Sequence, residues 1–128
     1  MIEIQVQSSE RTDFIDVTSA VAQAVDDLGL EDGVVTVFNP HTTAAVTINE
    51  GADPDVVRDM SVTLDKMVPW NDGYYHAEGN SAAHIKSSMY GSSVQVIVQQ
   101  GSLMLGTWQK IWFCDFDGPR HRKLWVSQ

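Results

Sequence analysis

The chain has 128 residues, enough for one domain that buries its own core without disulfides or a structural metal. Its net charge of −9 argues against nucleic acid or an anionic membrane as a partner, and no apolar run approaches the ~18 residues that cross a membrane. The single cysteine, Cys114, lies in an apolar run and fits a reducing compartment, which together with a start that lacks a basic signal region predicts a cytoplasmic protein.

Residues 2–7 alternate apolar and polar side chains, which predicts a half-buried strand. A helix is predicted over residues 16–29, with Thr18 as its N-cap and Gly29 as its left-handed stop. Its apolar residues recur at helical spacing and form one stripe: Val21, Val25 and Leu28. We expect this stripe to face the core.

Residues 34–39 and 43–49 are rich in β-branched side chains and predict two further strands. A second helix is expected to start at Asp53 and Pro54, where a capping residue precedes a proline in the first helical position. Its apolar stripe consists of Val56, Met60, Leu64 and Met67. Pro69 ends this helix.

A turn-rich loop over residues 70–80 leads into a short helix over residues 81–91. Either Asn80 or Ser81 is its expected cap, and Gly91 its stop. The face predicted to be buried consists of Ala82, Ile85 and Met89. His84 lies on the opposite, polar face.

The last part of the chain predicts three strands, over residues 92–100, 106–116 and 121–127. The middle strand is apolar on both faces and must be covered twice, so another subunit is a candidate for the second cover. The basic cluster of residues 119–123 alternates along the last strand and predicts a solvated sheet edge. Strands in adjacent pairs between helices predict a single α+β domain over residues 1–128, with a mixed or antiparallel sheet.

Three of the 4 histidines, His41, His76 and His84, sit among polar groups at turns or at a helix start. Their spacing matches no established zinc motif, so the pattern alone is a weak metal signal. His41 precedes the strand of residues 43–49 and Glu50 follows it. An extended arm of this length separates the two by about 30 Å at ~3.3 Å per residue, so they meet only through a bend or across a subunit boundary. The alternative is that both are exposed side chains without a role in a site.

The segment "HAEGNSAAH", residues 76–84, places Asn80 and His84 one helical turn apart on one face. A helix start with free N–H groups, together with His84 and Lys86, suits an anion such as phosphate. The alternative is a solvated helix face with a capping asparagine.

Four segments together are specific enough to indicate a family: "HTTAAVTINE", "DPDVVRDM", "EGNSAAHIKSSMYGSS" and "LGTWQKIWFCDFDGPRHRK". They resemble the signature blocks of the YjbQ family, small proteins also called secondary thiamine-phosphate synthases, from about Phe38 to Val126. The resemblance implies a sheet folded over on itself, a homotrimer with sites near subunit boundaries, and a thiamine-phosphate synthase-type side activity. It also implies one polar pocket formed by His41, Glu50, His76, Asn80 and His84.

These observations favour a small trimeric metabolic enzyme, transferase-like, that acts on a phosphorylated small molecule. The expected catalytic residues are His41, Glu50 and His84. The three histidines His41, His76 and His84 are also candidate ligands for a divalent metal such as zinc. The phosphate is expected to contact Asn80, Lys86, Ser87 and Ser88.

Two alternatives stay open. The same pocket would serve a non-catalytic trimer that binds a metabolite or a metal, because binding and catalysis need the same residue types. A structural trimer without a site would leave the turn histidine and the acid after the strand unexplained.

Overall fold

The computed structural model describes residues 1–128 and contains three helices and eight strands. Along the chain these are β1 (Ile2–Gln7), β2 (Asp13–Asp16), α1 (Thr18–Leu28), β3 (Gly33–Phe38), β4 (Ala44–Glu50), α2 (Pro54–Met67), α3 (Ser81–Tyr90), β5 (Ser93–Gln99), β6 (Ser102–Leu103), β7 (Gln109–Asp115) and β8 (His121–Ser127). The predicted α+β class is confirmed. The short strands β2 and β6 were not predicted.

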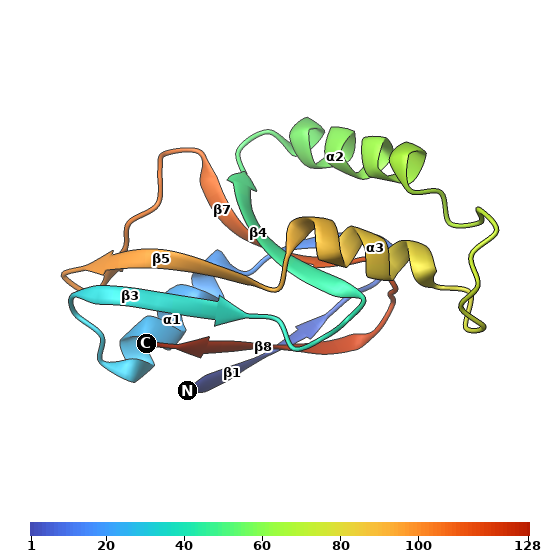
Figure 1. Ribbon diagram of the computed structural model, residues 1–128. Coiled ribbons are helices and arrows are strands. Elements are labelled where there is room, and N and C mark those ends of the chain that lie inside the picture. Colours follow the sequence, from blue (N-terminus) through green and yellow to red (C-terminus); the bar gives the residue numbers. More distant parts are fainter.

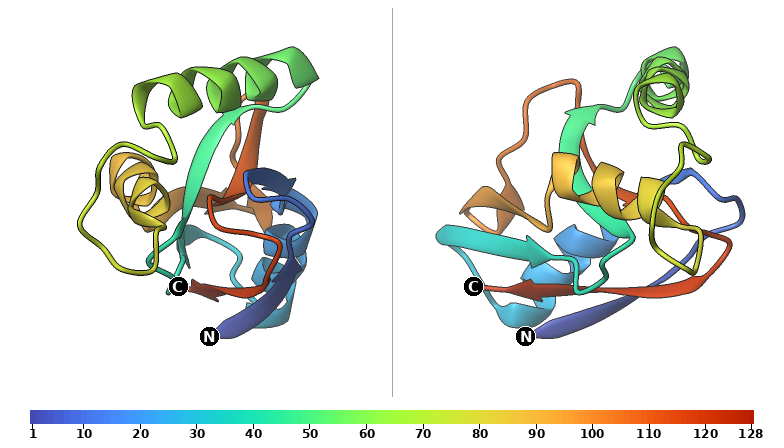
Figure 2. Two further views of the ribbon diagram at one scale, coloured as in Figure 1. Left: turned by 90° about the vertical axis from the view of Figure 1, so that its right-hand side faces the viewer. Right: turned by 45° about the vertical axis from the view of Figure 1, so that its right-hand side comes forward.

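The strands form two sheets in which every pairing is antiparallel. A five-stranded sheet has the order β1-β8-β3-β5-β6, and a three-stranded sheet has the order β2-β7-β4 (Figure 1). Pairing of Ile2 with Val126 brings the two termini together. Figure 2 shows β4 and β7 rising away from the larger sheet, with α2 and α3 on their outer side.

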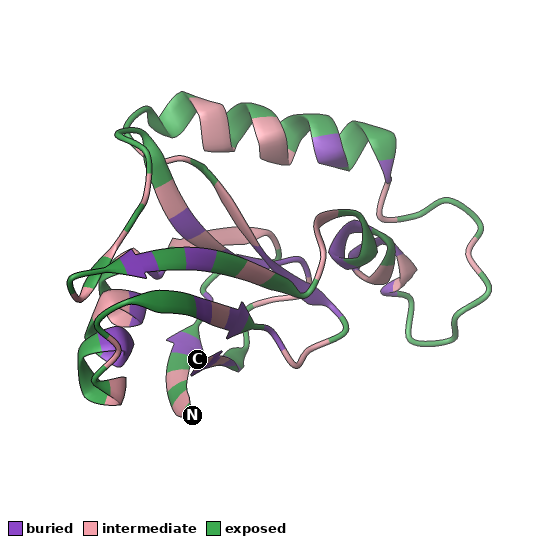
Figure 3. Cartoon of the chain, turned by 60° about the vertical axis from the view of Figure 1, so that its left-hand side comes forward, coloured by how far each residue is buried: buried purple, intermediate pink, exposed green.

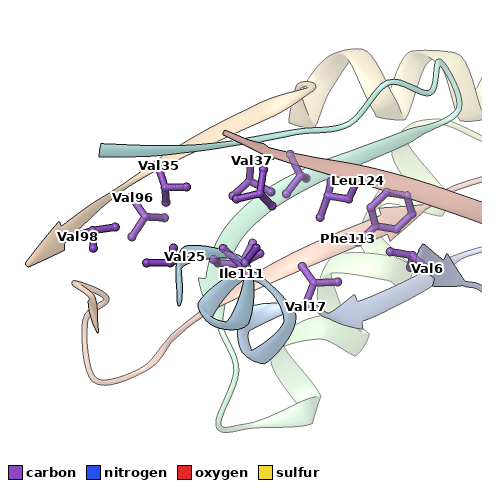
Figure 4. Close-up of a cluster of buried hydrophobic side chains, with 14 of the residues drawn as sticks. Val6, Val17, Val25, Val35, Val37, Val96, Val98, Ile111, Phe113 and Leu124 are labelled. Atoms are coloured by element: carbon purple, nitrogen blue, oxygen red, sulfur yellow. The ribbon is translucent and has the colours of Figure 1, made fainter. Parts of the chain in front are cut away.

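The main core lies between the two sheets and α1. It is built largely from valines, among them Val25 of α1, Val35 and Val37 of β3, and Val96 of β5 (Figure 4). A smaller cluster joins β4 and β7 to the other two helices and consists of Ala45, Leu64, Ala83, Cys114 and Phe116. Figure 3 shows that α2 is exposed along most of its length, with Leu64 its only buried residue.

Strand β7 is apolar on both faces, as predicted, but the chain covers both faces itself. Ile111 and Phe113 point into the main core, whereas Cys114 and the following Phe116 point into the smaller cluster under α2 and α3. A second subunit is therefore not needed to cover this strand. The homotrimer stays a prediction that rests on the family resemblance.

Two helix starts differ in how they are capped. Asp53 accepts a hydrogen bond from the N–H of Asp55 and Pro54 is the first residue of α2, which confirms that prediction. The cap predicted for α1 was wrong: Thr18 is already helical, and its N–H and hydroxyl both donate to the carboxylate of Asp16. Gly29 ends α1 in the left-handed region at φ 67°, as predicted.

The buried face predicted for α3 was right for Ala82, which is buried, and wrong for the other two residues. Ile85 and Met89 are 40% and 49% exposed, whereas Lys86 and Ser87 are buried with the two alanines that precede them. The helix packs on β4 through the small side chain of Ala83, and Lys86 pairs with Asp65 of α2. Small residues allow the close approach, so packing rather than apolar periodicity selects the face.

The basic cluster of residues 119–123 does not form a solvated edge. Strand β8 lies between β1 and β3, so it is an interior strand of the larger sheet. The side chain of Arg122 is on its buried face, in phase with Leu124 and Val126. No helix in the chain is long and apolar enough to cross a membrane.

Candidate functional site

His41, His76 and His84 line one open cavity of about 420 Å³ at the amino end of α3. Its walls come from the β3–β4 turn, the loop before α3, the start of α3, the β7–β8 turn and β8. We call it the arginine cavity; no hydrophobic residue lines it, and its residues are Pro40, His41, Thr42, Thr43, His76, Glu78, Asn80, His84, Asp117, Arg120 and Arg122. Figure 1 shows the β3–β4 turn and the start of β8 close to the amino end of α3.

Arg122 forms a buried ion pair with Asp115 behind this cavity. Its Nε and Nη2 donate to the two carboxylate oxygens of Asp115 at 3.0 and 2.8 Å, and Nη2 also donates to the hydroxyl of Thr43 at 2.8 Å. The hydroxyl of Ser8 donates to Asp115 at 2.6 Å. Burial raises the pKa of Asp115, but the hydrogen bonds from Arg122, Ser8 and a backbone N–H outweigh it and hold that pKa below its ordinary value.

The guanidinium of Arg122 is held in place but not saturated. Its Nη1 makes no hydrogen bond within the chain, so two N–H donors are left for a ligand at the cavity wall. Sequence reasoning missed this residue because it read the basic cluster as an edge. The signal was present in "HRKLWVS", where Arg122 shares the face of Leu124 and Val126.

Asn80 occupies the N-cap position of α3 but does not cap it. Its Nδ2 donates instead to Asp117 at 2.9 Å, and this carboxylate also accepts from Arg120 at 3.0 Å. Since a carboxylate only accepts, it fixes which way the amide points. The Oδ1 of Asn80 is then a buried acceptor without a donor, and the N–H groups of Ser81 and Ala82 have no acceptor in the chain.

His41 is tied to the backbone of β8. The N–H of Lys123 donates to its Nε2 at 2.9 Å, and the carbonyl of Lys123 lies 3.1 Å from the same nitrogen. One ring nitrogen serves only one of these contacts, and the shorter assigns Nε2 as the acceptor and the ring hydrogen to Nδ1. Burial, followed by the positive charge of Arg122, lowers the pKa of His41, which agrees with a neutral ring.

The ring of His41 contacts the backbone of β8 at a point where β3 has already ended. Strand β3 ends at Phe38, opposite Trp125, and the chain then turns through Pro40, which has no N–H to donate. The imidazole of His41 meets the peptide of Lys123 that the ladder would otherwise leave unpaired. This residue therefore has a structural contact as well as a place in the cavity.

His84 is the residue common to three cavities. Its ring packs edge-on against His76 at 5.4 Å between ring centres. The serine cavity, about 510 Å³, is lined by His41, Thr42, Ala44, His84, Ser87, Ser88, Gly91 and Ser92. The tyrosine cavity, about 570 Å³, is lined by Gly73, Tyr74, Tyr75, His76, Ser81, His84 and Ile85. His84 thus stands where a ligand in any of the three would pass.

Two predicted site residues, Glu50 and Lys86, line none of these three cavities. The carboxylate of Glu50 accepts from the N–H groups of Ala52 and Asp53 at 2.7 and 3.0 Å, at the far end of β4. Strand β4 pairs with β7 in unbroken register to that end, so no bulge or break in the ladder brings Glu50 back to His41. Lys86 is buried on the other side of α3, where it pairs with Asp65. Contact between Glu50 and His41 therefore requires a second subunit.

Ser87 and Ser88 line the serine cavity, but their hydroxyl hydrogens are already in use. Each donates to the backbone carbonyl one helical turn earlier, Ser87 to Ala83 at 2.7 Å and Ser88 to His84 at 3.0 Å. Their oxygens remain as acceptors. A phosphate needs donors, so in this geometry the arginines are better placed to hold it than the serines.

The three histidines share a cavity without forming a ligand set for a metal. No group of three or more His, Cys, Asp or Glu side chains is arranged to hold a metal ion. The Nε2 of His41 is also engaged by Lys123, which leaves one nitrogen of that ring. The divalent metal stays a prediction, to be tested by elemental analysis of the purified protein.

Comparison with known proteins gives a consistent result. The family model "UPF0047 protein YjbQ-like" matches residues 2–128. UPF0047 protein YugU of Bacillus subtilis (strain 168) is 47% identical over 125 residues, which cover 97% of this chain and 95% of that protein. A UPF0047 protein of Methanocaldococcus jannaschii is 42% identical over 127 residues, covering 99% and 92%.

Solved structures agree in both sequence and fold. A YjbQ/UPF0047-family protein from Clostridium acetobutylicum superposes with a TM-score of 0.97 at 55% identity, covering 99% of this chain and 98% of that one. A conserved hypothetical protein from Thermus thermophilus gives a TM-score of 0.92 at 36% identity, again covering 99% and 98%. The names of these relatives state no activity. The chain belongs to the YjbQ-like UPF0047 family, as its signature segments predicted.

Proposed function

We propose that this chain is a small enzyme that binds a phosphorylated small molecule in the arginine cavity, with the phosphate at the amino end of α3. The observation that carries the proposal is an uncapped helix start that opens on a cavity with two arginines and three histidines. Because Asn80 turns to Asp117, no side chain of the protein takes the place that an anion would fill.

The cavity offers hydrogen-bond donors that suit a phosphate, and its charged lining consists of Arg120 and Arg122 together with the carboxylates of Glu78 and Asp117. The free N–H groups at the helix start attract an anion by about 0.3–1 kcal/mol through the helix dipole. A hydrogen bond from a guanidinium to a phosphate oxygen adds roughly 1.5–3 kcal/mol. The chain as a whole carries −9, but exposed charges farther away than about 8 Å are largely screened at physiological salt. Local donors therefore decide the preference.

Histidine provides the proton chemistry in this proposal. His84, in edge contact with His76, lines all three of the named cavities, so a molecule bound in any of them meets its ring. It would exchange a proton with the group that bears the phosphate. In the thiamine-phosphate synthase reaction implied by the resemblance, a thiazole nitrogen forms a bond to the activated pyrimidine and displaces pyrophosphate, whose charge Arg120 and Arg122 would stabilise. The proposal also includes that the enzyme is a homotrimer.

The test is phosphate binding by the purified protein, followed by calorimetry, and turnover of a panel of phosphate monoesters and of the thiamine-phosphate synthase substrates. We expect Arg120→Gln and His84→Gln to weaken binding at least tenfold. Arg58→Gln, which removes an exposed arginine on α2, is the matched control and should leave binding unchanged. Equal phosphate affinity in all four proteins would overturn the proposal. Binding without turnover of any panel member would favour the non-catalytic trimer.

A further inference from the structure

We infer that the phosphorylated ligand carries an apolar, ring-sized group that lies in the tyrosine cavity while its phosphate lies in the arginine cavity. This inference rests on the proposed function and names the chemical class of its ligand: a phosphate ester of an aromatic or similarly apolar alcohol. It depends on how the two cavities join and on what lines each of them.

The two cavities share a wall. His76 and His84 line both, and their rings are in edge contact at 5.4 Å between centres. A molecule whose phosphate is held beside Asn80 and Arg122 therefore reaches the tyrosine cavity as soon as it extends past these two rings. Cavities of about 420 and 570 Å³ each fall within the size range of small-ligand sites, roughly 300–1,000 Å³.

The linings of the two cavities are of opposite character. The arginine cavity contains no hydrophobic residue, whereas Tyr74, Tyr75 and Ile85 form much of the tyrosine cavity. The hydroxyl of Tyr74 donates to the carbonyl of Pro69 at 2.6 Å, which holds that residue in position. A polyol in this cavity would lose hydrogen bonds to water and find few replacements, whereas an apolar ring would not.

The tyrosine cavity also has apolar surface that the chain itself leaves uncovered. Tyr75 is fully exposed, and Ile85 is 40% exposed on the face of α3 that sequence periodicity predicted to be buried. Covering such surface is favourable at about 25 cal/mol per Å². An aromatic group can stack on a tyrosine ring and cover the isoleucine together. Because the tyrosine cavity adjoins the hydrogen-bond donors of the arginine cavity, a phosphate ester can use both, whereas a purely apolar molecule uses only one.

A matched pair of ligands tests this inference. Methyl phosphate and phenyl phosphate carry the same charged group and differ in the apolar one. Titration calorimetry on the native protein should show phenyl phosphate binding about tenfold more tightly, the gain expected from covering an aromatic ring. Ile85→Ala and Tyr75→Ala should each remove much of this difference without changing the affinity for methyl phosphate. Both side chains are exposed, so neither change should disturb the fold.

Ile97→Ala is the matched control, since it removes another exposed isoleucine, on β5 and outside this cavity. It should change neither affinity.

The outcomes separate the inference from the proposed function. If both esters bind with equal affinity and Arg120→Gln weakens both, the apolar subsite is overturned and the phosphate site stands. If neither ester binds, or if Arg120→Gln changes nothing, both fall. If Ile85→Ala and Tyr75→Ala dissociate an oligomer in sedimentation experiments and leave the ester affinities equal, the exposed surface is an interface between copies of the chain, and the inference is overturned.

Discussion

The two ends of strand β4 each carry a predicted site residue, and they differ in how their polar groups are satisfied. At the Glu50 end, the carboxylate accepts from two backbone N–H groups of the next turn, so the chain completes that end by itself. At the His41 end, Nη1 of Arg122, Oδ1 of Asn80 and the first N–H groups of α3 have no partner in the chain. Unpaired polar groups beside a cavity indicate where a ligand contributes contacts.

The carboxylate at the His41 end is also more deeply buried than the carboxylate at the Glu50 end. Asp115, behind the His41 end, is fully buried and shares its two oxygens among Arg122, Ser8 and a backbone N–H. Glu50 is only partly buried. An identical change from carboxylate to amide should therefore have very different consequences at the two positions.

The largest effect is expected from Asp115→Asn. The amide cannot replace the charge, so Arg122 is left buried without its counterion, which costs about 3–5 kcal/mol of unfolding free energy. Glu50→Gln keeps an oxygen acceptor for the turn and should cost less than about 1 kcal/mol. Urea unfolding of both variants measures the difference. Similar losses at the two positions would show that burial is not what distinguishes the two ends.

The same carboxylate should make stability depend on acid pH. The pKa of Asp115 is lowered in the folded chain, so its contribution is fully present above the unfolded value of about 3.9 and is lost as the pH falls through the lower folded value. We expect the unfolding free energy to drop below about pH 4 in the parent. Asp115→Asn should have a shallower dependence in that range. Identical curves for Asp115→Asn and the parent would contradict this assignment.

The sequence predicted those parts of the fold that depend on local pattern. Alternation in β1, β5 and β8 and the chemistry of Asp53-Pro54 and Gly29 act within a few residues, so they can be read without the rest of the chain. Strands β2 and β6 have four and two residues, too few to show a period. They are strands only because β7 and β5 offer them partners.

The candidate site was predicted to the extent that its residues stand out as polar groups at turns. His41, His76, Asn80 and His84 were found in this way, and the structure brings them to one cavity. Arg122 was missed because its role depends on β8 lying between two strands, which no local pattern reveals. Lys86 was predicted to contact the phosphate, but it lies on another side of α3, where it pairs with Asp65. The packing of α3 on β4 decides this orientation, and helical periodicity did not predict it.

In a trimer, the Glu50 end of β4 in one subunit would meet the His41 end of β4 in its neighbour. Because β4 pairs with β7 in unbroken register, Glu50 meets His41 only if the partner is in another copy. We expect sedimentation equilibrium to give a trimer for the parent and for Glu50→Gln. We also expect Glu50→Gln to weaken phosphate binding about tenfold, or 1.4 kcal/mol, through the lost contact. A monomer at micromolar concentration would remove this role for Glu50. A trimer in which Glu50→Gln binds phosphate like the parent would remove it as well.

His41→Ala is expected to lower stability far less than Asp115→Asn does. It removes the acceptor for the N–H of Lys123, a residue at the surface where water can replace the contact, so the loss should be about 1 kcal/mol. His41→Gln offers an amide oxygen to the same N–H and should recover most of that stability. It has no imidazole, and if His41 also contacts the ligand, phosphate binding should stay weakened in both variants. Urea unfolding and calorimetry on the same two proteins therefore separate the two roles of the turn histidine. Recovery of both properties in His41→Gln would mean that the ring serves only to extend the sheet, and parental binding in His41→Ala would place the pocket elsewhere.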